Sequence, residues 1–314
     1  MWEKCNINMP IVPYKLLLIS STKPTTPDLI KNSNDMVAWG LWSELSKLKH
    51  ITMSHQMSHG ALNFSPVDFT LMHNYLSVPA VKNIKEVRAR TSRRIINCLE
   101  AAMTAAQVDY NFTFLPYPDW KKQGFAECET IPYPYLGALL NRNIPVKYPG
   151  SILLDHSWEE EDKETTWNDR LYEWLEPLRG LVHVGQMVRP AVKVPPPPGW
   201  IEQIPEAGYV EYLERTSPYE NYVVTHRESY GHSIIDMLAR GIRVLVPAPN
   251  GKAFAHSAIV SDMKLPTFCN KESLLKILSD KPACNWRKDY GTDVSEIVRR
   301  IDGYCQKELS GGVL

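Results

Sequence analysis

Two carboxylate side chains eight residues apart stand in the stretch VVTHRESYGHSIIDMLARGIRVLVP, residues 223–247. The residues before Glu228 are apolar and β-branched, which predicts a buried strand, and those after Gly231 are apolar at helical spacing. Glu228 therefore leads a strand-to-helix turn, and Asp236 lies about 8 to 12 Å further along the helix axis, at a rise of about 1.5 Å per residue. We expect the two carboxylates to contact different parts of one elongated ligand.

The turn itself predicts an anion site. A helix N-terminus at the carboxyl edge of a parallel sheet presents free backbone N–H groups, which favour phosphate. Carboxylates accept hydrogen bonds from paired hydroxyls, such as those of a sugar or a ribose. A nucleotide sugar combines these groups, with its diphosphate between the two sugars. The residues expected to hold this donor at the turn are Ser229, Tyr230, Gly231 and His232.

The same stretch resembles the C-terminal-domain signature of retaining glycosyltransferases with the two-Rossmann-domain (GT-B) fold. In that signature a glutamate, seven residues and a second glutamate follow a serine or threonine on the preceding strand. The resemblance implies a UDP-sugar donor, Glu228 beside its sugar, Asp236 beside its ribose, and transfer with retention at the anomeric carbon. Asp236 replaces the family's second glutamate, which shortens the reach by one methylene group. The residues that carry the resemblance are Thr225, Glu228, Ser229, Tyr230, Gly231, Asp236, Ala239 and Gly241 to Pro247.

Strand ends elsewhere supply further candidates. His73 ends the strand DFTLMH, where similar enzymes keep a histidine that faces the cleft, and it is predicted to be catalytic together with Glu228. Family members also carry an arginine and a lysine that neutralise the diphosphate. That pair is missing here, and Gln186 and Arg189 replace it by position. The remaining predicted donor contacts are Asp155 and His156, after the strand SILL, and Ser21, in the loop after the first strand.

The strand and helix patterns along the chain predict an α/β protein with two Rossmann-like domains and a cleft between them. Apolar runs such as YKLLLIS and NYVVTH indicate buried parallel strands, and RRIINCLEAAMTAAQ has the apolar period of a helix. We expect an acceptor-binding domain over residues 1–145 and a donor-binding domain over residues 146–290. The final helix, over residues 291–314, is expected to pack back on the first domain.

Composition limits the partners. The 35 lysines and arginines balance 35 aspartates and glutamates, so no overall field attracts nucleic acid or an anionic membrane. No apolar run approaches the about 20 residues of a membrane span, and the N-terminal stretch lacks the pattern of a secretory signal. The six cysteines have no CxxC spacing, which argues against a metal site or disulfides. We expect a cytoplasmic protein, in the host cytoplasm if the source is viral, that requires no metal and no cofactor besides the donor.

The acceptor stays open among a glycan, a small molecule and DNA. Arginines in the stretch RARTSRR would contact an anionic acceptor, although basic runs are usually solvated helix faces. These arginines are Arg88, Arg90, Arg93 and Arg94. The alternative functions are a phage-type DNA glycosyltransferase acting on a hydroxymethylated base, a nucleotide-sugar epimerase, and a non-catalytic nucleotide-binding protein of the same fold. An epimerase would need several carboxylates and histidines around the sugar.

Overall fold

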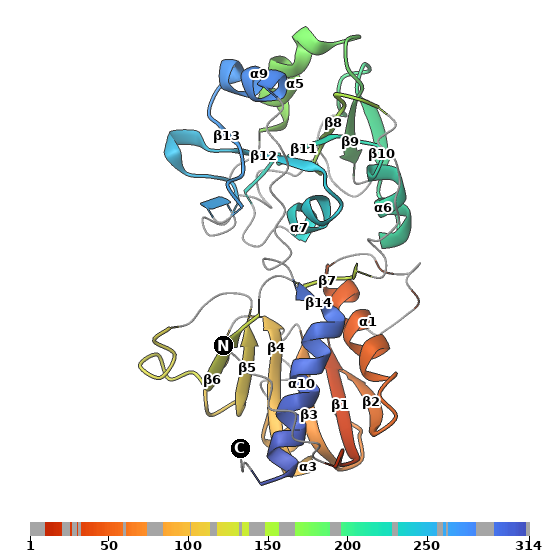
Figure 1. Ribbon diagram of the computed structural model, residues 1–314, viewed down its shortest axis with the longest axis vertical. Helices are drawn as coiled ribbons and strands as arrows, with labels where there is room; N and C mark the ends of the chain where they lie inside the picture. Colours follow the sequence, from red (N-terminus) through yellow and green to blue (C-terminus); the bar gives the residue numbers. More distant parts are fainter. Residues whose placement is uncertain are drawn as a thin grey trace. The chain divides into compact units, whose positions relative to one another are not determined.

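The chain folds into two compact units in a computed structural model (Figure 1). The first unit comprises residues 1–26, 34–134 and 292–314, and the second comprises residues 27–33 and 135–291. The structure describes residues 10–20, 26, 30, 33–58, 61–73, 84–100, 102–113, 118–131, 134–137, 148–156, 167–188, 196–227, 232–255, 260–261, 263–280 and 292–311.

The first unit is built on a six-stranded parallel sheet in the order β2-β1-β3-β4-β5-β6. Its strands are β1 (Tyr14–Ser20), β2 (Ile51–Met57), β3 (Val67–His73), β4 (Thr91–Glu100), β5 (Tyr110–Thr113) and β6 (Glu127–Thr130). Its helices are α1 (Ser33–Leu45), α3 (Ile84–Arg90) and α10 (Val294–Leu309). The chain adds β2 on one side of β1 and then adds β3 to β6 on the other side. The switch point of this sheet therefore lies between β1 and β3.

Helix α10 belongs to the first unit although it ends the described chain. The Asp293 side chain caps it by accepting a hydrogen bond from Ser295 N at 2.8 Å. Its apolar face is buried, and Tyr304 packs on Tyr110 of β5 with ring centroids 4.4 Å apart. The Asp302 carboxylate accepts a 2.9 Å hydrogen bond from the Tyr14 hydroxyl. The last helix is thus fixed to both β1 and β5.

The second unit is built on another six-stranded parallel sheet, in the order β10-β9-β8-β11-β12-β13. Its strands are β8 (Ile152–Leu154), β9 (Val184–Val188), β10 (Glu202–Pro205), β11 (Asn221–Val223), β12 (Arg243–Pro247) and β13 (Thr267–Phe268). The helices are α5 (Asn168–Leu175), η2 (Glu176–Leu178), α6 (Tyr209–Thr216), α7 (His232–Ala239), η3 (Pro249–Gly251) and α9 (Lys271–Asp280). Two short strands, β7 (Pro134–Tyr135) and β14 (Thr292–Asp293), form a separate pair.

The α/β fold predicted from the sequence, with two parallel sheets and helices, is confirmed. One element is wrong: the run RRIINCLEAAMTAAQ, expected to be helical, supplies strand β4. Ile95 and Ile96 on opposite faces of this strand are both fully buried, because β4 lies in the sheet between β3 and β5. A strand buried on both faces has no alternation of apolar and polar residues, so its sequence can imitate a buried helix.

Candidate functional site

The second sheet reverses its strand order between β8 and β11. From β8 the chain builds outward through β9 and β10, whereas from β11 it builds the other way through β12 and β13. In open α/β sheets ligands bind outside the carboxyl ends of the strands at such a switch point. Leu154 and Val223 are partners in the register of β8 and β11, so the residues after them meet at this edge.

Asp155 and His156 follow β8 at the switch point. The sequence predicted both residues as donor contacts. Asp155 is only 1% exposed, and its backbone N–H donates to Val223 O of β11 at 3.0 Å. Its Oδ1 accepts from the His156 N–H at 2.7 Å. The carboxylate therefore holds the first turn of its own loop while it lies under the edge of the sheet.

Thr225 and His226 follow β11 and join the same group. The Thr225 hydroxyl donates to His156 O at 2.7 Å, and His226 Nδ1 lies 3.2 Å from that hydroxyl oxygen. Since the single hydroxyl proton is used on the carbonyl, His226 Nδ1 must be the donor in the second contact. The same nitrogen lies 3.7 Å from Asp155 Oδ2. The sequence analysis missed His226, although its place beside Thr225 at a strand end was the available signal.

Gln186 lies on β9, paired in register with Leu154 of β8. Its amide nitrogen donates to Asp155 O at 3.4 Å and to Asn168 Oδ1 at 3.3 Å, and its amide oxygen accepts from the Tyr172 hydroxyl at 2.5 Å. Both N–H groups are therefore used within the protein. Gln186 supports the loop after β8, and this geometry does not favour the predicted contact with the donor.

Asp236 lies on the buried side of α7 and is 3% exposed. Burial raises the pKa of its carboxyl group from 3.8 to about 7, while Arg240 and a hydrogen bond from Tyr209 oppose that rise. Arg240 itself donates to Leu213 O and Thr216 Oγ1 at the C-terminal end of α6. The carboxyl group thus lies between α6 and α7, which does not favour the predicted ribose contact.

Several predicted site residues lie outside the described residues: Ser21, Arg189, Glu228, Ser229, Tyr230 and Gly231. His232 is described as the first residue of α7, without its side chain. The structure brings Asp155 and His156 to the switch point together with Thr225, which immediately precedes the stretch that carries Glu228. The roles of the predicted site residues that lie outside the described ranges stay predictions.

The switch point of the first sheet lies between β1 and β3, where Ser20 and His73 are partners in register. The Ser20 hydroxyl is 2.9 Å from His55 Nε2 of β2. His73 is 2% exposed, and its Nδ1 donates to Cys98 O at 3.2 Å, because a carbonyl only accepts. Nε2 is then the ring nitrogen that could accept a proton. The structure places the predicted catalytic histidine at the ligand edge of its sheet; its catalytic role stays a prediction.

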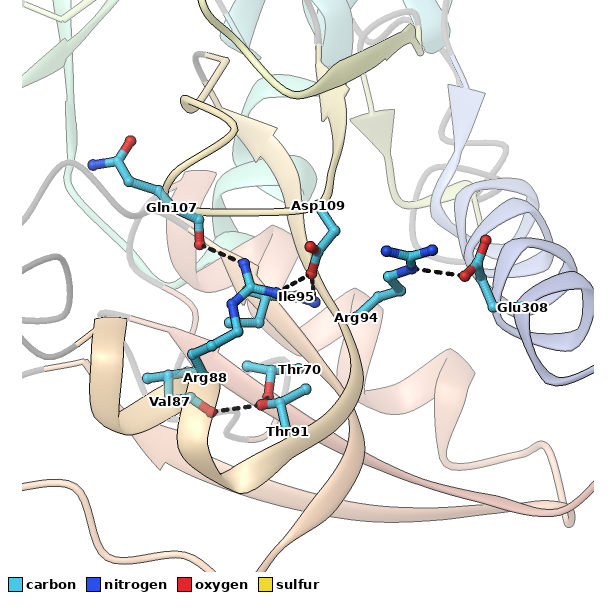
Figure 2. A network of polar contacts seen from close by, with 9 residues as sticks. All are labelled: Thr70, Val87, Arg88, Thr91, Arg94, Ile95, Gln107, Asp109 and Glu308. Atoms are coloured by element: carbon cyan, nitrogen blue, oxygen red, sulfur yellow. Dashed lines mark hydrogen bonds and ion pairs between the residues drawn. The ribbon is translucent and has the colours of Figure 1, made fainter. Parts of the chain in front are cut away.

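The arginine cluster lies at the opposite edge of the first sheet. Arg88 and Arg90 end α3, and Arg94 pairs in register with Phe69, near the start of β3. Figure 2 shows Arg88 bound to Asp109 and Arg94 bound to Glu308, the latter at 2.7 Å. Arg90 pairs with Glu86 at 2.7 Å, and Arg93 is exposed. Since ligands bind at the carboxyl ends of strands, the predicted acceptor patch is not supported.

Within the described parts of the chain, no group of three or more His, Cys, Asp or Glu side chains is arranged to hold a metal ion. No helix among the described elements has the length and apolar character needed to cross a membrane. The described cysteines form no disulfide; they are Cys98, Cys128, Cys269 and Cys305.

No protein family and no curated protein matches the sequence. Solved structures do match in three dimensions. The UDP-GlcNAc 2-epimerase from Methanocaldococcus jannaschii has a TM-score of 0.60 and 12% identity, over 92% of this chain and 99% of that one. An alpha-glucosyltransferase, solved with UDP-glucose and DNA containing an abasic site, has a TM-score of 0.53 and 10% identity, over 94% and 95%. HepE from Anabaena, solved with UDP-glucose, has a TM-score of 0.53 and 10% identity, over 95% and 100%.

These likenesses cover nearly the whole of each chain, so the two units together have the two-Rossmann-domain (GT-B) fold. At these identities the likeness concerns the fold alone, because one fold serves several chemistries. The solved relatives in fold include both an epimerase and a glucosyltransferase.

Proposed function

We propose that the chain is a glycosyltransferase that moves a sugar from a UDP-sugar to an acceptor hydroxyl, with retention at the anomeric carbon. The observation that carries this proposal is the polar group at the switch point of the second sheet, formed by Asp155, His156, Thr225 and His226. A fold of this kind binds its nucleotide at that place. Proteins that share the fold were solved with UDP-glucose, which supports a UDP-sugar as donor.

The donor would lie along the second unit, with its diphosphate against the amides of residues 229–232 and its sugar beside Glu228. Preorganised amides stabilise the charge that develops on a departing diphosphate and need no reorganisation during the reaction. When the protein holds donor and acceptor in the reactive orientation, the reaction between them becomes effectively unimolecular, which lowers its barrier. Asp155 and Thr225 fix the ends of β8 and β11 through their hydrogen bonds, and Glu228 follows Thr225 closely in the chain.

The first unit would hold the acceptor at its own switch point. Ser20, His55 and His73 meet there, and the donation from His73 Nδ1 to Cys98 O leaves Nε2 as the basic nitrogen. A neutral imidazole at this place suits an acceptor hydroxyl, whose proton must leave as the new bond forms.

The first test is turnover. Incubation with UDP-, GDP-, ADP- and dTDP-sugars is expected to release UDP slowly from one UDP-sugar, and the anomeric configuration of a transferred sugar can be read by NMR. Glu228→Gln should reduce UDP release by about 100-fold or more, the scale of losing one group that stabilises the transition state. Glu220→Gln, at the amino end of the same strand, is the matched control and should keep full turnover. Undiminished release by Glu228→Gln would remove Glu228 from the site.

Epimerisation of a UDP-sugar is the second candidate. Its supporting observation is the number of proton-transferring groups at the switch point, since a carboxylate and two histidines, Asp155, His156 and His226, meet there. The structural likeness to the UDP-GlcNAc 2-epimerase adds to it. Incubation with UDP-GlcNAc without an acceptor separates the two candidates: a 2-epimer of the intact nucleotide sugar indicates an epimerase, and free UDP indicates a transferase. UDP-sugar binding with neither product indicates a binding protein.

DNA is one acceptor to include in the assay. The glucosyltransferase of the same fold was solved with DNA, although the arginine cluster of this chain lies at the wrong edge of its sheet. Duplexes with and without hydroxymethylcytosine, assayed beside simple glycans, would show whether sugar is transferred to the base.

A further inference from the structure

A buried pair of ionisable groups lies at the switch point of the second sheet. Asp155 and His226 each have a side chain only 2% exposed, and the distance from Asp155 Oδ2 to His226 Nδ1 is 3.7 Å. Within the described residues, that oxygen accepts no hydrogen bond of normal geometry. Burial removes the hydration of this oxygen, and the neutral Tyr222 hydroxyl is the described donor group beside it.

The described groups that face Asp155 from β11 and α6 are neutral phenols. From β11, the Tyr222 hydroxyl lies beside Asp155, and burial raises its pKa far above the usual value, so it stays neutral. From α6, Tyr212 is also neutral because burial raises its pKa. His156 follows Asp155 in the chain, and Arg227 follows His226 and is exposed. Imidazole is the type of side chain that can become positive between pH 5 and 8, and His226 supplies one within reach of Asp155.

We propose that His226 takes up a proton when the diphosphate of the donor binds, and that its imidazolium neutralises Asp155 so that this edge of the sheet accepts an anion. The proposal rests on the proposed function, since it concerns the same donor site. It accounts for an otherwise unfavourable arrangement, because a bare carboxylate at the switch point would repel a phosphate in a medium of low dielectric constant. It also supplies a positive charge in a chain that lacks the arginine and lysine pair of similar enzymes.

Proton uptake fixes the direction of the pH dependence. A ligand that binds together with a proton binds most tightly at low pH and loses affinity as the pH rises, by at most about tenfold per pH unit for one proton. We therefore expect the affinity for the donor to fall about five- to tenfold between pH 6 and pH 8.

The test is calorimetric titration with UDP-glucose from pH 6 to pH 8, in buffers of different ionisation enthalpy, which reports the number of protons taken up. UDP-glucose is the probe because its diphosphate is a diester, whereas UDP ends in a phosphate that titrates near a pKa of about 6. The native protein should take up about 0.35 to 0.5 proton on average over this pH range. His226→Asn keeps an N–H near the position of Nδ1, and it should bind with no proton uptake and with an affinity that is independent of pH.

The matched control is His183→Asn. His183 also pairs with a carboxylate, Glu202, at 2.6 Å, but it precedes β9 at the amino edge of the same sheet. This variant should keep the native pH dependence. A His226→Asn variant that keeps the native proton uptake would overturn the proposal and leave the proposed function intact. Absence of UDP-glucose binding by the native protein at every pH would overturn both. If His226→Asn does not fold by circular dichroism, NMR titration of the native imidazole with and without UDP-glucose decides: an unchanged titration overturns the proposal.

Discussion

The two sheets have the same construction but carry different chemistry at their switch points. The edge between β1 and β3 holds hydroxyl and imidazole groups, Ser20, His55 and His73. The edge between β8 and β11 holds a buried carboxylate, Asp155, beside His226. The same topological rule predicts a ligand site at both edges. The two edges differ in the types of side chain that they carry. Under the proposed function, the charged part of a substrate would bind the second unit and an uncharged hydroxyl the first.

A buried acid in the second unit contrasts with the surface ion pairs around α10 in the first unit. In the first unit, charges surround α10 at the surface, as in Arg94 with Glu308 and Arg300 with Glu129. In the second unit, Asp236 is buried against Tyr209 between α6 and α7. Surface pairs contribute little to stability, whereas a buried acid with a raised pKa costs free energy when it ionises. Ionisation of Asp236 therefore costs the second unit free energy.

The largest effect is expected from Asp236→Asn. The pKa of the carboxyl group is about 7 in the folded chain against 3.8 for the free side chain. Because the folded state binds the proton more tightly, ionisation destabilises the fold: the cost grows between about pH 4 and 7, is complete above pH 7, and is absent below pH 4. Removal of the charge should stabilise the second unit by about 3 to 4 kcal/mol at pH 8 and hardly at all at pH 4. Hydrogen exchange of second-unit peptides at both pH values measures it.

Asp302→Asn in the first unit is the contrasting control. Its carboxylate accepts from Tyr14 at 2.9 Å and lies 2.9 Å from His50 Nε2, so its removal should destabilise by about 1 kcal/mol. Destabilisation by both variants at pH 8 would contradict the contrast between these two carboxyl groups.

A smaller effect is expected from Gly185→Ala in β9. The Tyr219 ring crosses this glycine so closely that an added Cβ would lie 2.7 Å from Cζ and closer still to the hydroxyl oxygen. Tyr219 cannot easily move, because it is 1% exposed and donates to Glu202 at 2.8 Å. The variant should lose about 2 to 3 kcal/mol in urea unfolding. Gly303→Ala in α10 of the first unit meets no atom within 4 Å and should gain about 0.5 to 1 kcal/mol.

The smallest effect is expected from the ion pair of Arg94 and Glu308. The arginine side chain is 45% exposed, so a double-mutant cycle with Arg94→Gln and Glu308→Gln should give a coupling of about 0.5 kcal/mol or less. Arg94→Gln should also leave turnover unchanged, because this side chain lies at the amino edge of its sheet. A loss of acceptor binding in this variant would restore the arginine cluster as an acceptor site.

The sequence predicted the strands with continuous apolar runs, such as β1, β3 and β12, because fully buried strands leave that pattern. It failed for β4, whose apolar residues also fit a helical period. For the candidate site, it placed Asp155, His156 and His73 at strand ends, where the structure has them. It missed His226 and did not reveal the hydrogen bonds of Gln186 within the protein, because tautomers and saturated hydrogen bonds depend on contacts between distant strands. The sequence could not show that the arginine cluster lies at the amino edge of its sheet, since the edge on which a residue lies is a property of topology.

The short segment of residues 27–33 ties the halves of the molecule together in an unusual way. The chain leaves the first unit after Thr26, contributes Ile30 to the second, and returns to the first at Asn34. Ile30 O accepts from Tyr209 N at 2.7 Å, which satisfies one of the unpaired donors at the start of α6. Together with the later crossings at 134–135 and 291–292, this gives the polypeptide four passages between halves. Exchange of one unit with that of another protein of this fold would accordingly require several junctions at once, so a single crossover could not exchange a whole unit.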